Sequence, residues 1–242
     1  TSVLLNGEDH VRIQVLCNGL DIQSCFKKAN EIDDYIDAHF DYAFDEKYGY
    51  KTTFPTNTGT GMKAGYTLHL PSLSDARRLN DISAELGRFG LKFRTVYGDG
   101  QNGYGNLYQI STQKTLGQDE HEVIKDLDDI VLQIVNQEKE QREHFYKKDK
   151  IQMDDEIYKS YGVLKYARKL SLKDSMVLIS ELMTGISLGV LQFAHNGRYN
   201  INELIMDIQP AVLRQNSGKA MSVAETDVLR AEYIRKYLPE II

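Results

Sequence analysis

Four side chains capable of acid–base or ion-pairing chemistry fall within one short segment, Asn6-Gly7-Glu8-Asp9-His10-Val11-Arg12. Glu8 and Asp9 offer carboxylates, His10 an imidazole and Arg12 a guanidinium, and residues that alternate as strands lie on both sides. A positioned carboxylate can orient a nucleophile or accept its proton, and a guanidinium beside it can bind an anion. The same composition also fits a solvated turn between two strands.

A second segment, Phe54-Pro55-Thr56-Asn57-Thr58-Gly59-Thr60-Gly61-Met62-Lys63-Ala64, is rich in glycine and threonine and ends in a base. Such a loop lets backbone N–H groups approach phosphate oxygens, although the Gly-Lys-Ser/Thr ending of a P-loop is missing. A long surface loop is the alternative interpretation. The residues expected to contact phosphate are Asn57, Thr58, Gly59, Thr60 and Gly61.

A third segment, Arg94-Thr95-Val96-Tyr97-Gly98-Asp99-Gly100, places a base late in a strand and a carboxylate five positions later. The carboxylate falls in a stretch, 98–105, that contains four glycines and reads as a mobile loop. The segment therefore offers one cation near the end of a strand and one anion on a flexible loop.

The pattern of apolar residues predicts the elements that position these segments. Period-two alternation and glycine-rich breaks indicate strands at 3–5, 11–15, 66–70, 91–97 and 107–110. Helical spacing indicates helices at 21–40, 74–89 and 119–145, the first with an apolar face expected to be core. From 151 on the chain has helical character, with cap-like starts at Ser171, Asn200 and Ser222. We expect an α+β domain over 1–147 and a small helical domain over 151–242.

Composition excludes several classes of protein. A formal net charge of −6 argues against broad nucleic-acid binding, and no apolar run approaches the roughly 20 residues that cross a bilayer. The two cysteines, Cys17 and Cys25, form no Cys-x-x-Cys pair, so they predict buried thiols without a disulfide framework or a zinc site. No signal peptide opens the chain, which predicts a cytoplasmic protein. Thr1 stands just before an expected strand, so we expect the sequence to be a fragment of a longer chain.

In order and placement, the three segments resemble the catalytic domain of the phosphagen (guanidino) kinases. That family carries Asn-Glu-Glu-Asp-His-x-Arg, then Cys-Pro-Thr-Asn-x-Gly-Thr-Gly-Met-Arg, then an Arg-Gly strand with a Glu-bearing loop. The resemblance covers about 1–145, and the helical remainder, with Tyr161-Gly162-Val163-Leu164 and Leu229-Arg230-Ala231, resembles the extension of bacterial protein arginine kinases. It implies a largely antiparallel sheet flanked by helices, followed by an all-helical domain. The implied activity is transfer of the ATP γ-phosphoryl group to arginine side chains of proteins, marking them for regulation or Clp-dependent degradation.

The resemblance also implies a role for each matching residue. Glu8 would orient the target guanidinium or take its proton, and Asp99 would clamp the guanidinium from the other side. Phosphate-binding cations would surround ATP with Mg²⁺ bridging its oxygens, and no metal would be held by the protein itself. His10 would contact the nucleotide or serve only to orient the turn. The expected ATP-binding residues are His10, Arg12, Lys63, Ala64, Gly65, Tyr66, Thr67, Arg94, Thr95, Val96, Tyr97 and Gly98.

Four positions depart from the family pattern: Gly7, Phe54, Lys63 and Asp99 stand where the family has glutamate, cysteine, arginine and glutamate. They leave open a catalytically impaired relative that binds phosphoarginine as a regulator, or an adaptor whose helical domain only docks partners.

The segment Thr226-Asp227-Val228-Leu229-Arg230-Ala231 resembles the family's regulatory Arg-Asp-x-x-Arg-Ala motif, with Thr226 in place of its first arginine. Asp227 and Arg230 would share a helix face and hold a phosphorylated guanidinium between opposite charges. An ordinary surface ion pair three residues apart is the alternative.

The partners implied by the resemblance are arginine-bearing protein substrates, a zinc-binding activator protein, a heat-shock repressor and the Clp protease machinery. A homodimer is compatible with the helical domain, and neither nucleic acid nor membrane is expected as a partner.

Overall fold

The computed structural model describes residues 1–99, 103–194 and 201–242. The expected loop at Gly100 and the expected helix start at Asn200 lie outside these residues. The chain forms two compact units. The first unit comprises Thr1–Leu68, Arg77–Arg94 and Tyr108–Gln137, and the second comprises His69–Ala76, Thr95–Leu107 and Glu138–Ile242.

The first unit begins with an antiparallel hairpin of β1 (Ser2–Leu5) and β2 (Val11–Gln14), in which Leu5 lies opposite Val11. Helix α1 (Ile22–Asp37) follows, and the Asp21 side chain caps its start by accepting a hydrogen bond from the backbone N–H of Ser24 at 3.1 Å. The expectation that the apolar face of α1 is core is confirmed only at Ile22. The other apolar residues of the helix are half-buried and Phe40, beyond it, is exposed, because the small hairpin does not cover the whole stripe.

Next come a short hairpin that the sequence pattern did not predict, β3 (Phe44–Asp45) and β4 (Gly49–Tyr50), and a single 3₁₀ turn, η1 (Pro55–Asn57). Strands β5 (Gly65–His69), β6 (Leu91–Thr95) and β7 (Leu107–Thr112) form a sheet in the order β5-β7-β6. The described strands thus form three small sheets, and the α+β class is confirmed.

The three-stranded sheet is antiparallel on both sides of β7. On one side Thr112 N donates to Ala64 O and Leu70 N donates to Asn106 O, each at 2.9 Å. On the other side Gln113 N donates to Gly90 O at 3.2 Å and Val96 N donates to Leu107 O at 2.9 Å. In the first unit the apolar side of α4 (Glu120–Lys148) covers one face of this sheet. Its residues Ile124, Leu127 and Val131 have no exposed surface.

The helix predicted at 74–89 is two helices, α2 (Pro71–Asp75) in the second unit and α3 (Leu79–Arg88) in the first. Arg77 interrupts them because its backbone adopts a left-handed conformation, with φ of 57°. In the second unit the buried carboxylate of Glu138 accepts hydrogen bonds from the N–H groups of Ser72 and Leu73 at 3.1 and 2.9 Å. A carboxylate from a distant part of the chain thereby caps α2, where the helix dipole favours negative charge.

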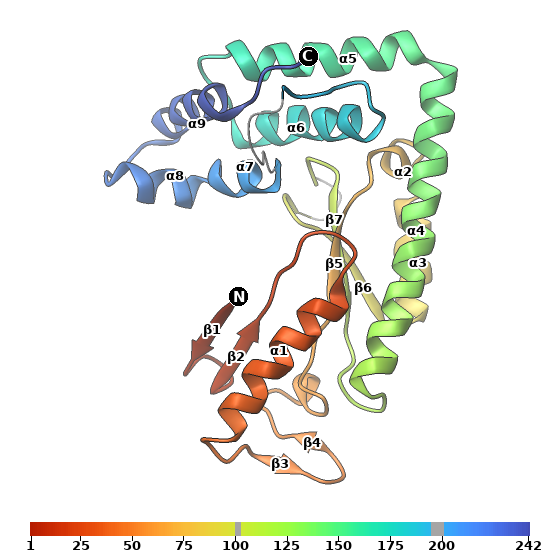
Figure 1. The fold of residues 1–242 in the computed structure, drawn as a ribbon, viewed down its shortest axis with the longest axis vertical. Helices are drawn as coiled ribbons and strands as arrows, with labels where there is room; N and C mark the ends of the chain where they lie inside the picture. Colours follow the sequence, from red (N-terminus) through yellow and green to blue (C-terminus); the bar gives the residue numbers. More distant parts are fainter. Residues whose placement is uncertain (100–102, 195–200) are drawn as a thin grey trace. The chain divides into compact units, whose positions relative to one another are not determined.

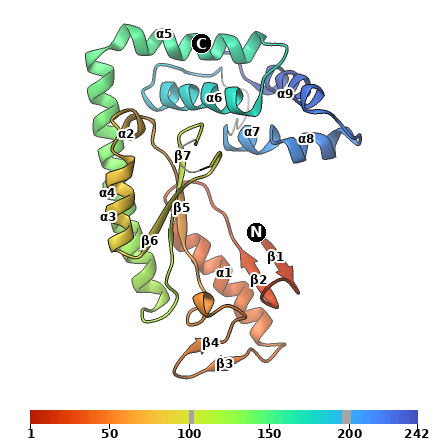
Figure 2. The same ribbon diagram turned by 180° about the vertical axis from the view of Figure 1, so that it is seen from behind.

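The helical part of the second unit contains α5 (Lys150–Tyr166), α6 (Leu172–Ser187), α7 (Ile201–Asp207), α8 (Pro210–Ser217) and α9 (Val223–Tyr237). Helices α5 and α6 pack along each other in both views (Figures 1 and 2). Ser171 caps α6, and Ser222 and Glu225 form a reciprocal capping box at the start of α9, as predicted. No helix in the described ranges is long and apolar enough to cross a membrane.

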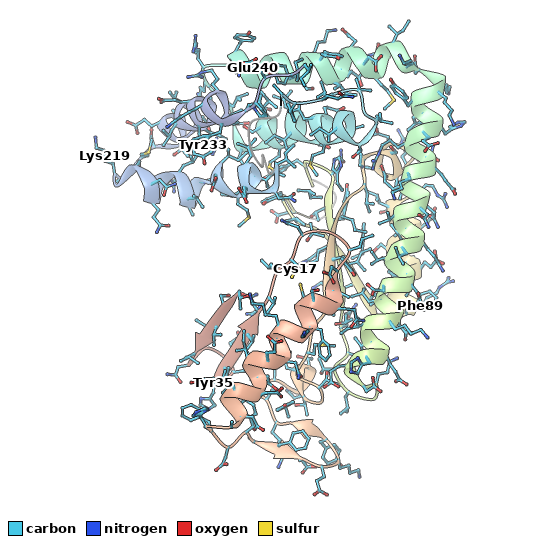
Figure 3. All side chains as sticks on the ribbon, viewed as in Figure 1. Cys17, Tyr35, Phe89, Lys219, Tyr233 and Glu240 are labelled. Carbon is cyan, nitrogen blue, oxygen red and sulfur yellow. The ribbon has the colours of Figure 1, made fainter. Side chains whose placement is uncertain are left out.

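The prediction that both cysteines are buried is wrong. Cys17 is exposed in the connection between β2 and α1 (Figure 3), and Cys25 is half-buried on α1. Cysteine is among the residue types most often buried, so the side-chain type did not decide the exposure of these two.

Candidate active site

The turn between β1 and β2 carries the first cluster of candidate residues. Asn6, at φ of 56°, donates its N–H to His10 O at 2.9 Å and closes the turn. Glu8 and His10 are exposed at its tip, and Asp9 is half-buried. The turn therefore presents the Glu8 carboxylate to solvent while Asp9 points into the protein.

Asp9 fastens this turn to the glycine- and threonine-rich loop. Its Oδ1 accepts from the N–H of Thr53 at 2.8 Å, and its Oδ2 accepts from Nδ2 of Asn57 at 3.1 Å. The Thr53 hydroxyl in turn donates to the carbonyl oxygen of Glu8 at 2.6 Å. The Thr53 N–H, with smaller contributions from Asn57 and His10, lowers the pKa of Asp9 below its ordinary value, so the carboxylate is ionised at neutral pH.

Asn57 extends the connection to the base that ends the loop. Lys63 Nζ donates to Asn57 Oδ1 at 2.6 Å, so a carboxylate, an amide and an ammonium group follow one another as the Asp9–Asn57–Lys63 chain. Each link uses complementary donor and acceptor atoms, which fixes the orientation of the amide. The structure thus brings together the turn that bears Glu8, the loop and Lys63, all within the first unit.

The loop itself is held by its own backbone. The N–H groups of Asn57, Thr58, Gly59 and Thr60 donate to carbonyl oxygens of Phe54, Pro55, Tyr50 and Thr115. The expectation that these four N–H groups are available to phosphate oxygens is therefore wrong for the folded loop. The backbone of the loop instead forms a support for the side chains around it.

Gly59 and Thr115 explain why this loop holds its shape. The φ of Gly59 is 115°, and a Cβ there would lie 2.0 Å from the carbonyl oxygen of Thr115. The Thr115 hydroxyl also donates to Thr58 O at 2.7 Å. Thr115 was not singled out from the sequence, because nothing in its local pattern marks it as a partner of a loop some 57 residues away.

The expected ATP-binding residues of β5 divide between two faces. Lys63, Gly65 and Thr67 are exposed, whereas Ala64 and Tyr66 are buried. The Tyr66 hydroxyl donates to Asp128 on α4, which directs its ring away from the open face. The side chains of Ala64 and Tyr66 are therefore not available to a ligand on the open side.

Arg94 lies on the same open face as Thr67. Its Nε donates to Oε1 of Gln109 on β7 at 2.7 Å. The backbone hydrogen bonds on either side of β7 place Thr67 and Arg94 as the two cross-strand neighbours of Gln109. Lys92, two residues before Arg94, is exposed as well, so this face is cationic.

Arg12 is exposed on β2 and forms no ion pair with any residue in the described ranges. Thr95, Val96, Tyr97, Gly98 and Asp99 belong to the second unit. There the Thr95 hydroxyl donates to Gly98 O at 3.4 Å, and the ring of Tyr97 stacks on that of Tyr104 with centroids 6.3 Å apart. The candidate residues are thus divided between the units. The first unit contains Glu8, Arg12, Lys63 and Arg94, and the second unit contains Asp99.

The residues of the expected regulatory motif are buried. Arg230 is 1% exposed, and it donates to Asp227 Oδ1 at 2.6 Å, Leu170 O at 2.8 Å and Ile208 O at 3.0 Å. Thr226 donates its hydroxyl to Ser222 O at 2.8 Å, and Ala231 has no exposed surface. Asp227 and Arg230 do share a face, but the surface-pair interpretation is wrong, and the folded motif offers no free guanidinium to a phosphoarginine.

Comparison with known proteins assigns both parts of the chain. Residues 1–141 match the family described as ATP:guanido phosphotransferase, C-terminal catalytic domain. The chain belongs to the ATP:guanido phosphotransferase family. Residues 150–241 match the family described as Protein-arginine kinase McsB C-terminal domain. The resemblance seen in the three motifs and in the helical extension is therefore confirmed.

Among its relatives, the protein-arginine kinase of Bacillus licheniformis is 40% identical over 237 residues, covering 98% of this chain and 65% of the relative. That of Clostridium kluyveri is 40% identical over 237 residues, covering 98% of this chain and 68% of the relative. The chain thus spans about two thirds of the length of these two protein-arginine kinases. The solved structure of a lombricine kinase has a TM-score of 0.49 and 25% identity, over 57% of this chain and 38% of that one.

Proposed function

We propose that the protein transfers the γ-phosphoryl group of ATP to arginine side chains of proteins. The observation that carries the proposal is the Asp9–Asn57–Lys63 chain, which holds the Glu8 turn beside a cation. Phosphoryl transfer needs a carboxylate at the nucleophile and cations at the phosphates, held in fixed relation. Family membership and the relatives' description as protein-arginine kinases supply the acceptor, an arginine of a protein.

Glu8 is the group proposed to act on the acceptor. Its main-chain carbonyl is held by the Thr53 hydroxyl, while its carboxylate forms no ion pair with a described residue and is exposed. It is free to accept N–H groups of an incoming guanidinium, orienting one nitrogen for attack and receiving its proton. Asp99 is proposed as the second carboxylate on that guanidinium.

Lys63, Arg12 and Arg94 are proposed to bind the phosphates. Lys63 gives one of its three N–H bonds to Asn57 and keeps two. Arg94 gives only its Nε to Gln109 and keeps both terminal nitrogens. These cations offset the charge of the moving phosphoryl group, and lysine at 63 does so as a point charge without the planar fork of arginine.

The charges of the residues present fit a nucleoside triphosphate with its magnesium ion. The open face of the sheet carries exposed Lys92 and Arg94 on β6, and exposed Lys63 precedes β5. No group of three or more His, Cys, Asp or Glu in the described ranges could hold a metal ion, so Mg²⁺ would be held by phosphate oxygens and water. When bound, Mg²⁺ would neutralise part of the phosphate charge.

The departures from the family pattern do not remove this machinery. A Cβ at Gly7 would meet Leu4 Cδ2 at 3.4 Å, an ordinary contact, so the missing glutamate is not excluded by space. Phe54 is 45% exposed and cannot supply a thiol. The alternative, a non-catalytic phosphoarginine reader, loses support because its motif cation, Arg230, is buried and makes three hydrogen bonds within the protein.

An enzyme of this kind works where ATP is available, so we propose a cytoplasmic protein. The partners implied by family resemblance remain proposals: arginine-bearing substrates, a zinc-binding activator, a heat-shock repressor and the Clp protease machinery.

The proposed activity is tested by incubating the whole protein with ATP and an arginine-rich protein, then measuring acid-labile phosphate on the acceptor. Glu8→Gln should lower transfer by about 10²-fold or more while leaving ATP binding nearly intact. Arg94→Ala should weaken ATP binding as well, because its charge acts on the bound nucleotide before reaction. Nucleotide binding without transfer by the unaltered protein would instead support the regulatory alternative.

A further inference from the structure

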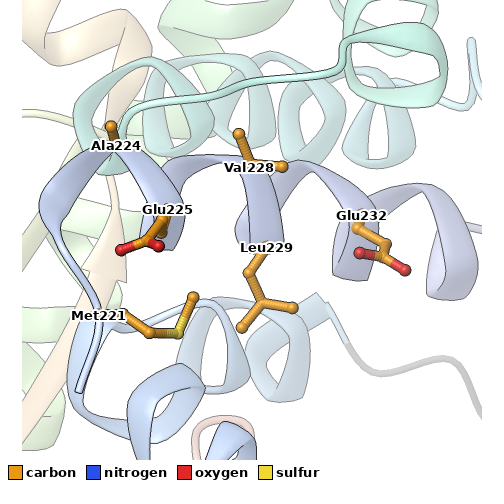
Figure 4. A pocket seen from close by; sticks show the side chains of 6 residues that line it. All are labelled: Met221, Ala224, Glu225, Val228, Leu229 and Glu232. Atoms are coloured by element: carbon orange, nitrogen blue, oxygen red, sulfur yellow. The ribbon is translucent and has the colours of Figure 1, made fainter. Parts of the chain in front are cut away.

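An open groove runs along the outward face of α9 and encloses about 430 Å³ (Figure 4). Its lining is mainly apolar, with a carboxylate at each end of the helical part. We call it the α9 groove; it is lined by Met221, Ala224, Glu225, Val228, Leu229 and Glu232. In Figure 4 Leu229 lies along α9 between Glu225 and Glu232, and the Met221 side chain extends toward it.

The groove faces outward because the opposite side of α9 is clamped. Arg230 is buried against Leu170 O and Ile208 O, and Ile234 has no exposed surface. At 3.6 residues per turn, Glu225, Val228 and Glu232 fall on the other side of the helix. The buried side of α9 therefore sets which residues face solvent, and Val228 is 48% exposed.

The two carboxylates of the groove are not neutralised by the protein. Glu232 is exposed and forms no ion pair with any described residue. Glu225 Oε2 accepts from the N–H and hydroxyl of Ser222 at 2.8 and 2.7 Å, which lowers the pKa of Glu225 and keeps it ionised. Of the cations nearest to Glu232 along the chain, Arg230 pairs with Asp227, Arg235 donates to Ala167 O and Lys236 lies over the ring of Tyr237. None of the three forms an ion pair with either carboxylate among the described residues. The groove thus joins an apolar floor to two negative charges.

The spacing of these charges defines the ligand. Glu225 and Glu232 are seven residues apart, or about 10 Å along a helix rising 1.5 Å per residue. An extended chain rises roughly 3.3 Å per residue and its alternate side chains share a face, so two arginines four residues apart point the same way about 13 Å apart. Their long side chains can therefore meet both carboxylates, while the apolar residue midway between them covers Val228 and Leu229.

We propose that the α9 groove docks protein-substrate segments in which two unmodified arginines flank apolar residues. Phosphorylation replaces the positive charge of arginine by negative charge, which Glu225 and Glu232 would repel. The groove would therefore hold the substrate and release the product. This inference rests on the proposed function, because it takes the arginine-bearing partner to be the kinase substrate.

The test is binding of a fluorescein-labelled peptide containing Arg-Ala-Leu-Ala-Arg to the whole protein without ATP, followed by fluorescence anisotropy. The same peptide with two citrullines or two phosphoarginines should bind at least ten-fold more weakly. Glu232→Arg should weaken binding of the arginine peptide by about five-fold or more, and added salt should reduce the difference. Glu140→Arg, on the exposed surface of α4, is the matched charge control and should leave binding unchanged.

The apolar floor is tested separately with Val228→Asp. Its matched control is Val163→Asp on α5, because the two valines are 48% and 45% exposed. Equal weakening by the variants and their controls would overturn the proposal, as would tighter binding of the phosphoarginine peptide. If Val228→Asp lowers the molecular mass measured by sedimentation and leaves peptide binding unchanged, the groove is occupied by a second copy of the chain. Arginine phosphorylation by the unaltered protein, measured separately, distinguishes failure of this inference from failure of the proposed function.

Discussion

Asp9 accepts the backbone N–H of Thr53 at 2.8 Å, a contact between residues 44 positions apart in the chain. It joins the turn that carries Glu8 to the loop that leads to Lys63 through the other oxygen of the same carboxylate. Asp9 is thus a positioning residue, because it acts on the proposed site through its neighbours.

We expect Asp9→Asn to reduce phosphoryl transfer by roughly 10-fold to 10²-fold, because displacing a catalytic group by about 1 Å has effects of that size. An amide cannot accept from both Thr53 N and Asn57 Nδ2 in the present geometry. The measurement is kcat and KM for arginine phosphorylation, with the loss confined mainly to kcat. Asp41→Asn, at an exposed position, is the control and should keep full activity. Equal rates for the two variants would show that the turn is positioned without Asp9.

We expect Gly59→Ala to destabilise the loop far more than Gly117→Ala. Both glycines have positive φ, 115° and 100°, so both substitutions introduce similar backbone strain, about 1 kcal/mol. Only at Gly59 does the added Cβ approach a carbonyl oxygen, Thr115 O at 2.0 Å, while nothing lies within 4 Å at Gly117. For Gly59→Ala, both the midpoint temperature of thermal unfolding and the rate of phosphoryl transfer should fall. Similar results for the two variants would mean that the loop relaxes around the extra carbon.

We expect Arg230→Ala to lower the free energy of unfolding by about 3–5 kcal/mol, the usual effect of breaking a buried ion pair from one side. Asp227 would be left with an uncompensated charge, and the carbonyl oxygens of Leu170 and Ile208 would lose their donors. Chemical denaturation of the whole protein measures the change. Lys159→Ala removes an exposed pair with Asp155 and should change stability by less than about 1 kcal/mol. A small effect at Arg230 would contradict its role in holding α9.

We expect stability to fall as the pH drops below about 6.5, in a way that depends on His69. Burial, together with the charge of Arg142, lowers the pKa of His69 to about 3, and the ring shares a hydrogen bond of 2.7 Å with the Ser180 hydroxyl. Above pH 6.5 the ring is neutral in both folded and unfolded states and contributes no pH dependence. Below pH 6.5 the His69 ring is protonated in the unfolded chain but stays neutral in the folded chain. This difference lowers the free energy of unfolding by about 2 kcal/mol at pH 5.

The measurement for His69 is the urea midpoint at pH 7.5 and pH 5. His69→Gln should reduce the difference between the two pH values, even if it lowers stability at both. His39→Gln, at an exposed ring, should leave the difference as it is in the unaltered protein. An unchanged difference in His69→Gln would show that another group controls the acid sensitivity.

The sequence by itself determined the class of fold, most of its elements and the family. Alternation predicted β1, β2 and β5 to β7 because strand side chains alternate between two faces. Ser171 and Ser222 marked helix starts because capping requires only residues a few positions apart. The sequence also marked Glu8, Lys63 and Arg94 as candidates for chemistry, since side-chain type and order along the chain carry that information.

Only the tertiary structure decided which of these groups meet and which are buried. Asp9 and Thr115 acquire their importance from partners more than forty residues away, and no local pattern encodes such contacts. Asp227 and Arg230 read as a surface pair, yet the connections before α6 and after α7, which supply Leu170 O and Ile208 O, cover them. That burial leaves the opposite face of α9 exposed to solvent, because a surface helix that packs one side against the protein exposes the other.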